Sequence, residues 1–173
     1  MRRIWAYRPW LDTCAASVVA LLAWLLLHVT DVPLPPEALR TSFATGVAAL
    51  SGMAATAGTF AVGSMVSSDS NRMKRIRSAP ENEEALPANW VSMLGGPLTA
   101  GAASLLTLMM VRPLYDLALA VNLGALSLTL LSFYRAIHWL QFTWGQESHE
   151  ARKPRTNLPE GTPEPETPFI ERS

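Results

Sequence analysis

Four long stretches without a charged side chain constrain this chain more than any other feature of its sequence. No Asp, Glu, Lys or Arg lies within residues 13–30, 41–68, 85–111 or 117–134. An α-helix rises about 1.5 Å per residue and the hydrocarbon core of a bilayer is about 30 Å thick, so roughly 20 apolar residues span it. The sequence therefore predicts an all-α membrane protein with four transmembrane helices.

The four helices are expected to form two hairpins inside a membrane domain of residues 13–140, because prolines mark the short segments 31–40 and 112–116 between them. The expected helices cover about 13–30, 41–66, 90–111 and 115–139. For the third helix a start at Pro97 also stays open, since proline suits the first turn of a helix and two glycines precede it.

Basic residues predict the orientation of the chain, because Lys and Arg in short loops stay on the cytoplasmic side. All of them except Arg40 and Arg112 precede the first helix, lie in the connection 67–89, or end or follow the fourth helix. Both termini are therefore expected in the cytoplasm, with 1–12 as an N-terminal segment of a protein of the cytoplasmic (plasma) membrane. No small-x-small cleavage pattern follows Leu27, so the first helix is expected to be retained.

Two polar cytoplasmic parts are expected beside the helices. Residues 145–173 are rich in Glu, Pro and Thr, which predicts a disordered tail. The connection carries a basic cluster that is expected to rest on anionic lipid, at about 1 kcal/mol per residue. Its members are Arg72, Lys74, Arg75 and Arg77. A net charge of zero disfavours a nucleic-acid partner.

The second helix is unusually rich in small residues. Rows of small residues spaced by four let helix backbones approach closely, which lipid cannot replace. We therefore expect this helix to be central in the bundle or to line a contact between subunits, although a general preference for alanine would give a similar composition. The candidate packing residues are Ala44, Ala48, Gly52, Thr56, Gly58 and Gly63.

Amide and charged side chains inside the expected spans are few. Asn122 is the only Asn, Gln or charged residue well inside a span, and an unpaired amide in hydrocarbon is costly. It is expected to bond a partner helix, with a ligand or ion contact as the alternative. Arg135 and His138 lie at the cytoplasmic end of the fourth helix, where snorkelling to the headgroups is expected.

The chemistry of catalysis is not visible in this sequence. The three histidines are far apart, Cys14 is the single cysteine, and no nucleophile elbow or phosphate-binding glycine loop is found. Membrane enzymes and proton-coupled carriers place ionisable groups near the middle of the bilayer, and this chain has none there. We therefore expect a non-catalytic protein without a metal or another cofactor.

The glycine- and alanine-rich segment 46–63, followed by the basic run Asn71-Arg-Met-Lys-Arg-Ile-Arg77, resembles small four-pass membrane proteins of actinobacteria and their phages. Some of those proteins exclude competing phages. The resemblance carries over no functional residue. It implies an accessory or assembly factor that acts in the lipid bilayer on a second copy or on another membrane protein, with phage exclusion as one setting.

Two alternative functions stay open. A holin-like or channel protein would need a polar path, for which several chains would have to combine their polar side chains. The candidates for that path are Ser51, Thr56, Thr59, Ser64 and Asn122. A small-molecule carrier would need a homodimer to double the number of spans.

Overall fold

The computed structural model describes residues 8–30, 35–78, 85–110 and 114–151, and within these ranges every regular element is a helix. The predicted all-α class is therefore confirmed for this part of the chain. The helices are α2 (Trp10–Thr30), α3 (Glu37–Ser67), α4 (Asn71–Ser78), α5 (Ala85–Thr107) and α6 (Tyr115–Ala151).

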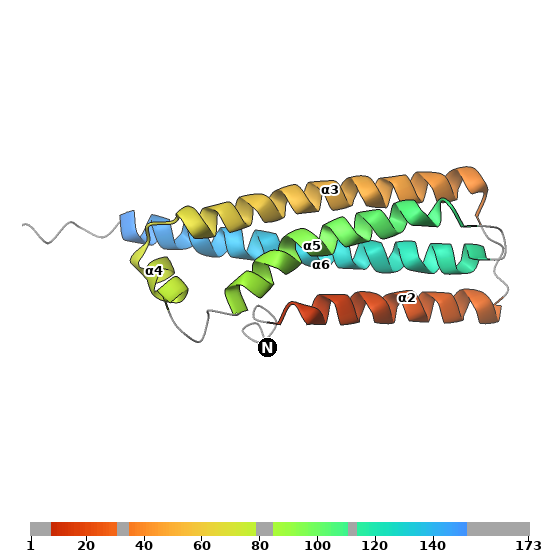
Figure 1. The fold of residues 1–173 in the computed structure, drawn as a ribbon, viewed down its shortest axis with the longest axis horizontal. Helices are drawn as coiled ribbons and strands as arrows, with labels where there is room; N and C mark the ends of the chain where they lie inside the picture. The colour runs from red at the N-terminus through yellow and green to blue at the C-terminus, as the bar shows by residue number, and fades with distance from the viewer. Residues whose placement is uncertain (1–7, 31–34, 79–84, 111–113, 152–173) are drawn as a thin grey trace, which may run out of the picture.

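The four long helices lie along one axis and alternate in direction, as Figure 1 shows. α3, α5 and α6 all contact one another, whereas α2 packs mainly against α6 at the side of this group. The end of α2 and the start of α3 lie at one end of the bundle, together with the end of α5 and the start of α6. The short helix α4 lies at the opposite end.

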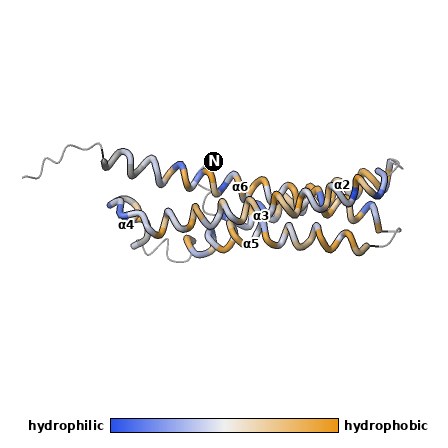
Figure 2. Tube along the Cα trace, turned by 90° about the horizontal axis from the view of Figure 1, so that it is seen from above, coloured by the Kyte–Doolittle hydropathy of each residue, from blue (hydrophilic) through white to orange (hydrophobic). Residues whose placement is uncertain are grey.

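Three of these helices, α2, α3 and α6, are long and apolar enough to cross a membrane. α5 is not among them, because its proline and small residues lower its hydropathy, and Asn89 lies in its second turn. α5 nevertheless lies beside the others along much of their length (Figure 1), while α4 is among the hydrophilic parts of the tube in Figure 2. The fold is thus that of a helical membrane protein with at least three candidate spans in the described residues.

Several helix ends differ from those expected. α5 begins at Ala85, before both expected starts, because Pro87 occupies its first turn, where the missing N–H of proline costs nothing. Pro97 lies inside α5 rather than at its start. α6 continues to Ala151, so residues 145–151 of the expected tail are helical, which suits their Gln, Glu and Ala content. The remainder of that tail lies outside the described residues.

The core consists of two apolar clusters that follow one another along the bundle. The larger cluster lies toward α4 and receives Met73 from that helix, which explains why α4 packs against the end of the bundle. Its buried members are Ala61, Met65, Met73, Leu86, Met93, Ala136 and Trp139. The smaller cluster, nearer the middle, contains Val47, Ala100 and Ala125. Small residues at many of these positions bring the helices close together.

Candidate functional site

A buried charged cluster joins three helices toward the α4 end of the bundle. Arg135 of α6 donates through Nε to Oδ2 of Asp12 in α2 at 2.9 Å, and its Nη2 lies 2.8 Å from the same oxygen. Its Nη1 donates to Oδ1 of Asn89 in α5 at 2.9 Å. All three side chains are almost completely buried. Because an unpaired buried charge is far more costly than a paired one, these contacts tie α2 and α5 to α6.

The expectation that Arg135 snorkels to the headgroups is wrong, because its side chain is 0% exposed. Asp12 and Arg135 border two charge-free intervals at the same end of antiparallel helices. Their opposite charges at matched depth are the signal that could have revealed the pair. His138 is partly buried and makes an edge contact with Trp139.

The contact between α2 and α6 depends on a glycine that the sequence analysis did not select. A Cβ added at Gly124 would lie 2.8 Å from Cβ of Ala20 and 3.1 Å from the carbonyl oxygen of Ala16. Ala16 and Ala20 are one turn apart on α2, so they form a small-xxx-small pair facing Gly124. Among the described glycines, Gly124 is the one that faces α2, and this close contact holds α2 against α6 midway along the bundle.

Gly58 is the predicted packing residue with the tightest surroundings. A Cβ built there would lie 2.6 Å from the backbone oxygen of Met93 in α5. Pro97 lies four residues after Met93 and has no N–H to donate to that oxygen. The absence of a side chain at Gly58 therefore lets the backbone of α3 cover a carbonyl that α5 itself leaves without its helical partner.

A pair of hydroxyls adds a polar contact between α3 and α6. The oxygens of Ser51 and Thr129 lie 2.8 Å apart, and both residues are buried. Each hydroxyl also lies within hydrogen-bonding distance of a carbonyl of its own helix, Val47 for Ser51 and Ala125 for Thr129. The two hydroxyl protons are shared among these three short contacts, so both oxygens have a hydrogen-bond partner inside the bundle.

The other predicted packing residues lie on different sides of α3. Ala44 is buried and Ala48 is partly buried, whereas Gly52, Thr56 and Gly63 are exposed. A strict four-residue row drifts by about 40° per step around a helix with 3.6 residues per turn, so a row that starts inside ends outside. An added Cβ at Gly52 or Gly63 would meet nothing within 4 Å.

These exposed residues belong to a continuous small-residue row, which we call the outer face of α3. Its members are separated by three, four or seven residues, which places them on one side of the helix. They are Thr45, Gly52, Thr56, Thr59 and Gly63, all exposed. Each of the three threonine hydroxyls donates to a carbonyl of α3 itself. The outer face of α3 is therefore narrow, smooth and without strongly polar groups.

The residues considered for a channel path do not come together in one chain. Ser51 is buried against α6, whereas Thr56 and Thr59 lie on the outer face of α3. Ser64 is partly buried and bonds the carbonyl of Ala61. A path shared by them would have to be formed between chains.

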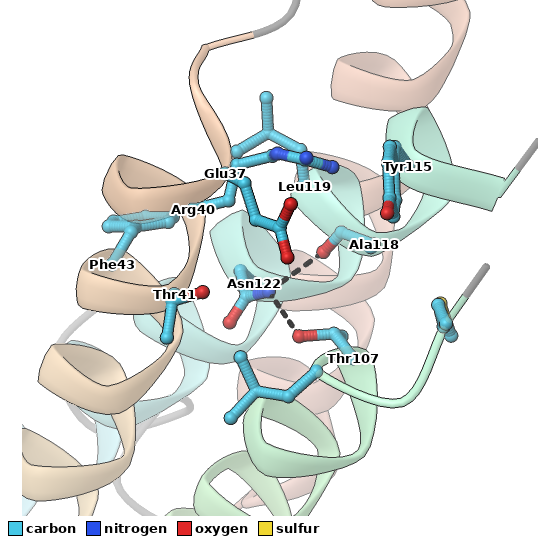
Figure 3. A pocket seen from close by; sticks show the side chains of 11 residues that line it. Glu37, Arg40, Thr41, Phe43, Thr107, Tyr115, Ala118, Leu119 and Asn122 are labelled. Carbon is cyan, nitrogen blue, oxygen red and sulfur yellow. Dashed lines mark hydrogen bonds between the residues drawn. The ribbon is translucent and has the colours of Figure 1, made fainter. Parts of the chain in front are cut away.

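Asn122 lies in a small pocket at the end of the bundle opposite α4. Its Nδ2 donates to Oγ1 of Thr107 at 2.7 Å and to the carbonyl of Ala118 at 2.8 Å, and the residue is 4% exposed. The pocket has a volume of about 60 Å³. It is lined from α3, α5 and α6, as Figure 3 shows, and its polar lining residues are Glu37, Arg40, Thr41, Thr107, Tyr115 and Asn122.

Charged residues at the rim of the pocket are arranged in a defined way. The guanidinium of Arg40 lies 3.6 Å from the centre of the Tyr115 ring, a cation–π contact between α3 and α6. Glu37 lies one turn before Arg40, is exposed, and presents its carboxylate to the space above Asn122 in Figure 3. The pocket thus combines one carboxylate, one guanidinium and a buried amide.

The expected membrane-surface cluster lies on α4. Lys74 and Arg75 are exposed, and Lys74 pairs with Asp69 at 3.2 Å between two well-exposed side chains. Such an exposed pair contributes little to stability. The side chains of Arg72 and Arg77 lie outside the described part of the structure.

The described residues contain no group of three or more His, Cys, Asp or Glu that could hold a metal ion. No family model, no curated protein and no solved structure matches the chain.

Proposed function

We propose that this chain is a non-catalytic protein of the cytoplasmic membrane that acts as an accessory or assembly factor through helix contacts. In this proposal all four long helices cross the bilayer and both termini are cytoplasmic. The observation that carries it is the outer face of α3, a row of small residues turned away from the chain's own core.

Intrachain packing does not account for the glycines of this face. Gly costs about 1 kcal/mol relative to Ala in a helix interior, and it is useful where a backbone must approach closely. Gly58 meets that requirement inside the bundle, but Gly52 and Gly63 have open space where a side chain would be. Close approach of a helix from another chain would explain why glycine stands at these two positions.

Lipid alone is a poor explanation for the outer face of α3. The exposed side of α2 carries large apolar residues, including Leu21, Leu22 and Leu26, which suit acyl chains, and α3 exposes Met53 and Phe60 beside the outer face in the same way. Transmembrane helices associate through small residues, because close backbones gain dispersion contacts that lipid does not offer. The difference between these large side chains and the small-residue row favours lipid around the former and another helix against the outer face of α3.

A second copy of this chain is the partner that we propose. A twofold contact uses the same surface on both subunits, so a smooth face without bulky or charged side chains is complementary to itself.

A phage-exclusion role would fit such an assembly factor. It is tested by plaque counts in hosts that express the chain or carry the empty vector.

Leucine substitutions on and beside the outer face of α3 test this proposal. Gly52→Leu and Gly63→Leu should each lower the dimer fraction in nanodisc or mild-detergent crosslinking by about tenfold, because two close-packed backbones cannot hold the new side chains. Gly46→Leu is the matched control, since Gly46 is exposed on the same helix, also has open space at its Cβ, and lies off the row.

The result also separates the alternatives. Unchanged association in both row variants would overturn the second copy as partner. Capture of a different membrane protein that is lost only in the row variants would identify another chain as the occupant. Dye entry or loss of membrane potential on expression would favour a pore, for which the described residues of a single chain provide no continuous polar path.

A further inference from the structure

The pocket around Asn122 has unused hydrogen-bond acceptors, and this feature points to a ligand. The amide orientation is fixed, because Nδ2 donates to the carbonyl of Ala118, which can only accept. The hydroxyl of Thr107 uses its proton on the carbonyl of Ser104 at 2.6 Å, so it too accepts from Nδ2. Oδ1 of Asn122 is therefore the atom left over, and it has no hydrogen-bond partner among the described residues.

An unused acceptor at this position is costly. Asn122 is 4% exposed, and leaving a buried acceptor without a partner destabilises the folded state. Glu37 contributes a second acceptor to the same pocket, and the described residues include no ion pair of its carboxylate. Figure 3 shows the carboxylate of Glu37 and the amide of Asn122 lining one space. The two acceptors favour a ligand group that donates hydrogen bonds and carries positive charge, while Arg40, whose buried Nε also has no partner among the described residues, can receive an anionic group of the same ligand.

Size limits the ligand further. The volume is about 60 Å³, and since a water-sized group needs roughly 15 Å³ on this measure, about four such groups fit. Leu119 and Phe43 supply apolar walls. A primary ammonium on a short carbon stem matches this space in size, because it offers three N–H donors to the two acceptors while its stem contacts the apolar walls.

We propose that the Asn122 pocket binds a primary ammonium group, held by Oδ1 of Asn122 and the carboxylate of Glu37. Two sources carry this chemistry, namely a small free amine and the headgroup of an ethanolamine phospholipid. Arg40 lies at the same rim, where it can meet the phosphate of such a lipid. This inference concerns the end of the bundle opposite α4 and does not depend on self-association through α3.

The free-amine arm uses the full chain in lipid-free detergent. Ethylammonium chloride should raise the thermal unfolding midpoint in a concentration-dependent way, because a ligand that binds only the folded state stabilises it by mass action. Tetramethylammonium chloride has the same charge but no N–H donor, so it should have no such effect. Equal responses to both salts would overturn the proposal, because they would indicate a general salt effect.

The lipid arm uses nanodiscs that differ only in headgroup. Phosphatidylethanolamine should be retained on the protein in native mass spectrometry, whereas phosphatidylcholine, whose nitrogen is fully methylated, should not. Binding in this arm alone identifies a lipid ligand, and binding in the detergent arm alone identifies a free amine. Absence of binding in both arms would overturn the proposal.

One isosteric variant tests whether the free amine or the lipid binds in this pocket. Glu37→Gln removes the negative charge of an exposed side chain, so the fold should persist, and the apparent dissociation constant should rise at least tenfold. Asp69→Asn is the matched control, because it makes the same chemical change at an exposed carboxylate near α4. Affinity that Glu37→Gln leaves unchanged would overturn the assignment to this pocket. Substitution of Asn122 is avoided, since its amide also joins α5 to α6.

Discussion

Asp12 and Arg135, separated by 123 positions in the sequence, form a buried ion pair in which Nε of the guanidinium lies 2.9 Å from Oδ2 of the carboxylate. Apart from Asp12 and Ala16, the residues of α2 are partly buried or exposed. The ion pair therefore holds the one long helix that packs mainly against a single neighbour. Asn89, whose Oδ1 accepts a hydrogen bond from Nη1 of Arg135, extends this cluster to α5.

Removal of one charge from this pair should be strongly destabilising. Asp12→Asn leaves Arg135 buried without a counter-charge, and Arg135→Leu leaves Asp12 in the same state, so each should lower the free energy of unfolding by about 3–5 kcal/mol. The measurement is denaturant unfolding in mixed micelles, followed by tryptophan fluorescence.

A double variant separates the cost of an unpaired charge from the value of the pair itself. Asp12→Asn combined with Arg135→Leu leaves no charge buried, so the loss should be smaller than in either single variant. A double variant whose loss equals the sum of the single losses would show that the two side chains do not act on each other.

Gly124→Ala should loosen α2 from α6. The new Cβ would lie 2.8 Å from Cβ of Ala20, so the helices must separate, and overpacking of this kind costs about 1–3 kcal/mol. Gly145→Ala on the same helix meets nothing within 4 Å, so it should be neutral or stabilise by up to about 1 kcal/mol. Unfolding in mixed micelles compares the two, and equal effects would contradict the close approach.

Gly58→Ala tests the contact between α3 and α5. The obstacle is the backbone oxygen of Met93 at 2.6 Å, which cannot rotate away as a side chain can. We expect a loss of about 1–3 kcal/mol, together with a faster hydrogen exchange of α5 amides around Pro97. Gly46→Ala has open space and serves as the control. A stabilised Gly58→Ala variant would show that α3 and α5 are farther apart than described.

The sequence predicted the helices more reliably than their contacts, and the reason is physical. Runs of apolar residues report on each helix alone, so the hydrophobic spans and the all-α class follow directly from them. Contacts depend on how helices rotate and at what depth they meet. The row that begins at Ala44 therefore leaves the core before Thr56, and Gly58 gains its importance from a carbonyl on another helix.

The candidate site was predicted only in part. Asn122 was identified because an amide in a long apolar run needs a partner, but its bond to Thr107 requires knowledge of how α5 lies against α6. Arg135 was assigned to the headgroups because it ends a charge-free interval, and its acidic partner is visible only when the depths of α2 and α6 in the bundle are compared. Glu37 and Tyr115 lie in short connections or at helix starts, where local sequence contains no sign of a shared pocket.

The number of spans and the orientation can be tested by thiol labelling of intact cells. Cys14 is the only cysteine, so Cys14→Ala gives a cysteine-free background into which Asp69→Cys, Glu37→Cys and Met109→Cys are introduced singly. Basic residues are concentrated beside α4, so an impermeant maleimide should label positions 37 and 109 in intact cells and position 69 only after permeabilisation.

Position 109 decides whether α5 crosses the bilayer, because Met109 is 81% exposed and follows the end of that helix. Its labelling together with position 37 would mean that α5 crosses in the same direction as α2, although it is less hydrophobic than the three candidate spans. Protection of position 109 until permeabilisation, with position 37 labelled, would place both ends of α5 on the cytoplasmic side. The reverse pattern at all three positions would keep four spans and invert the protein in the membrane.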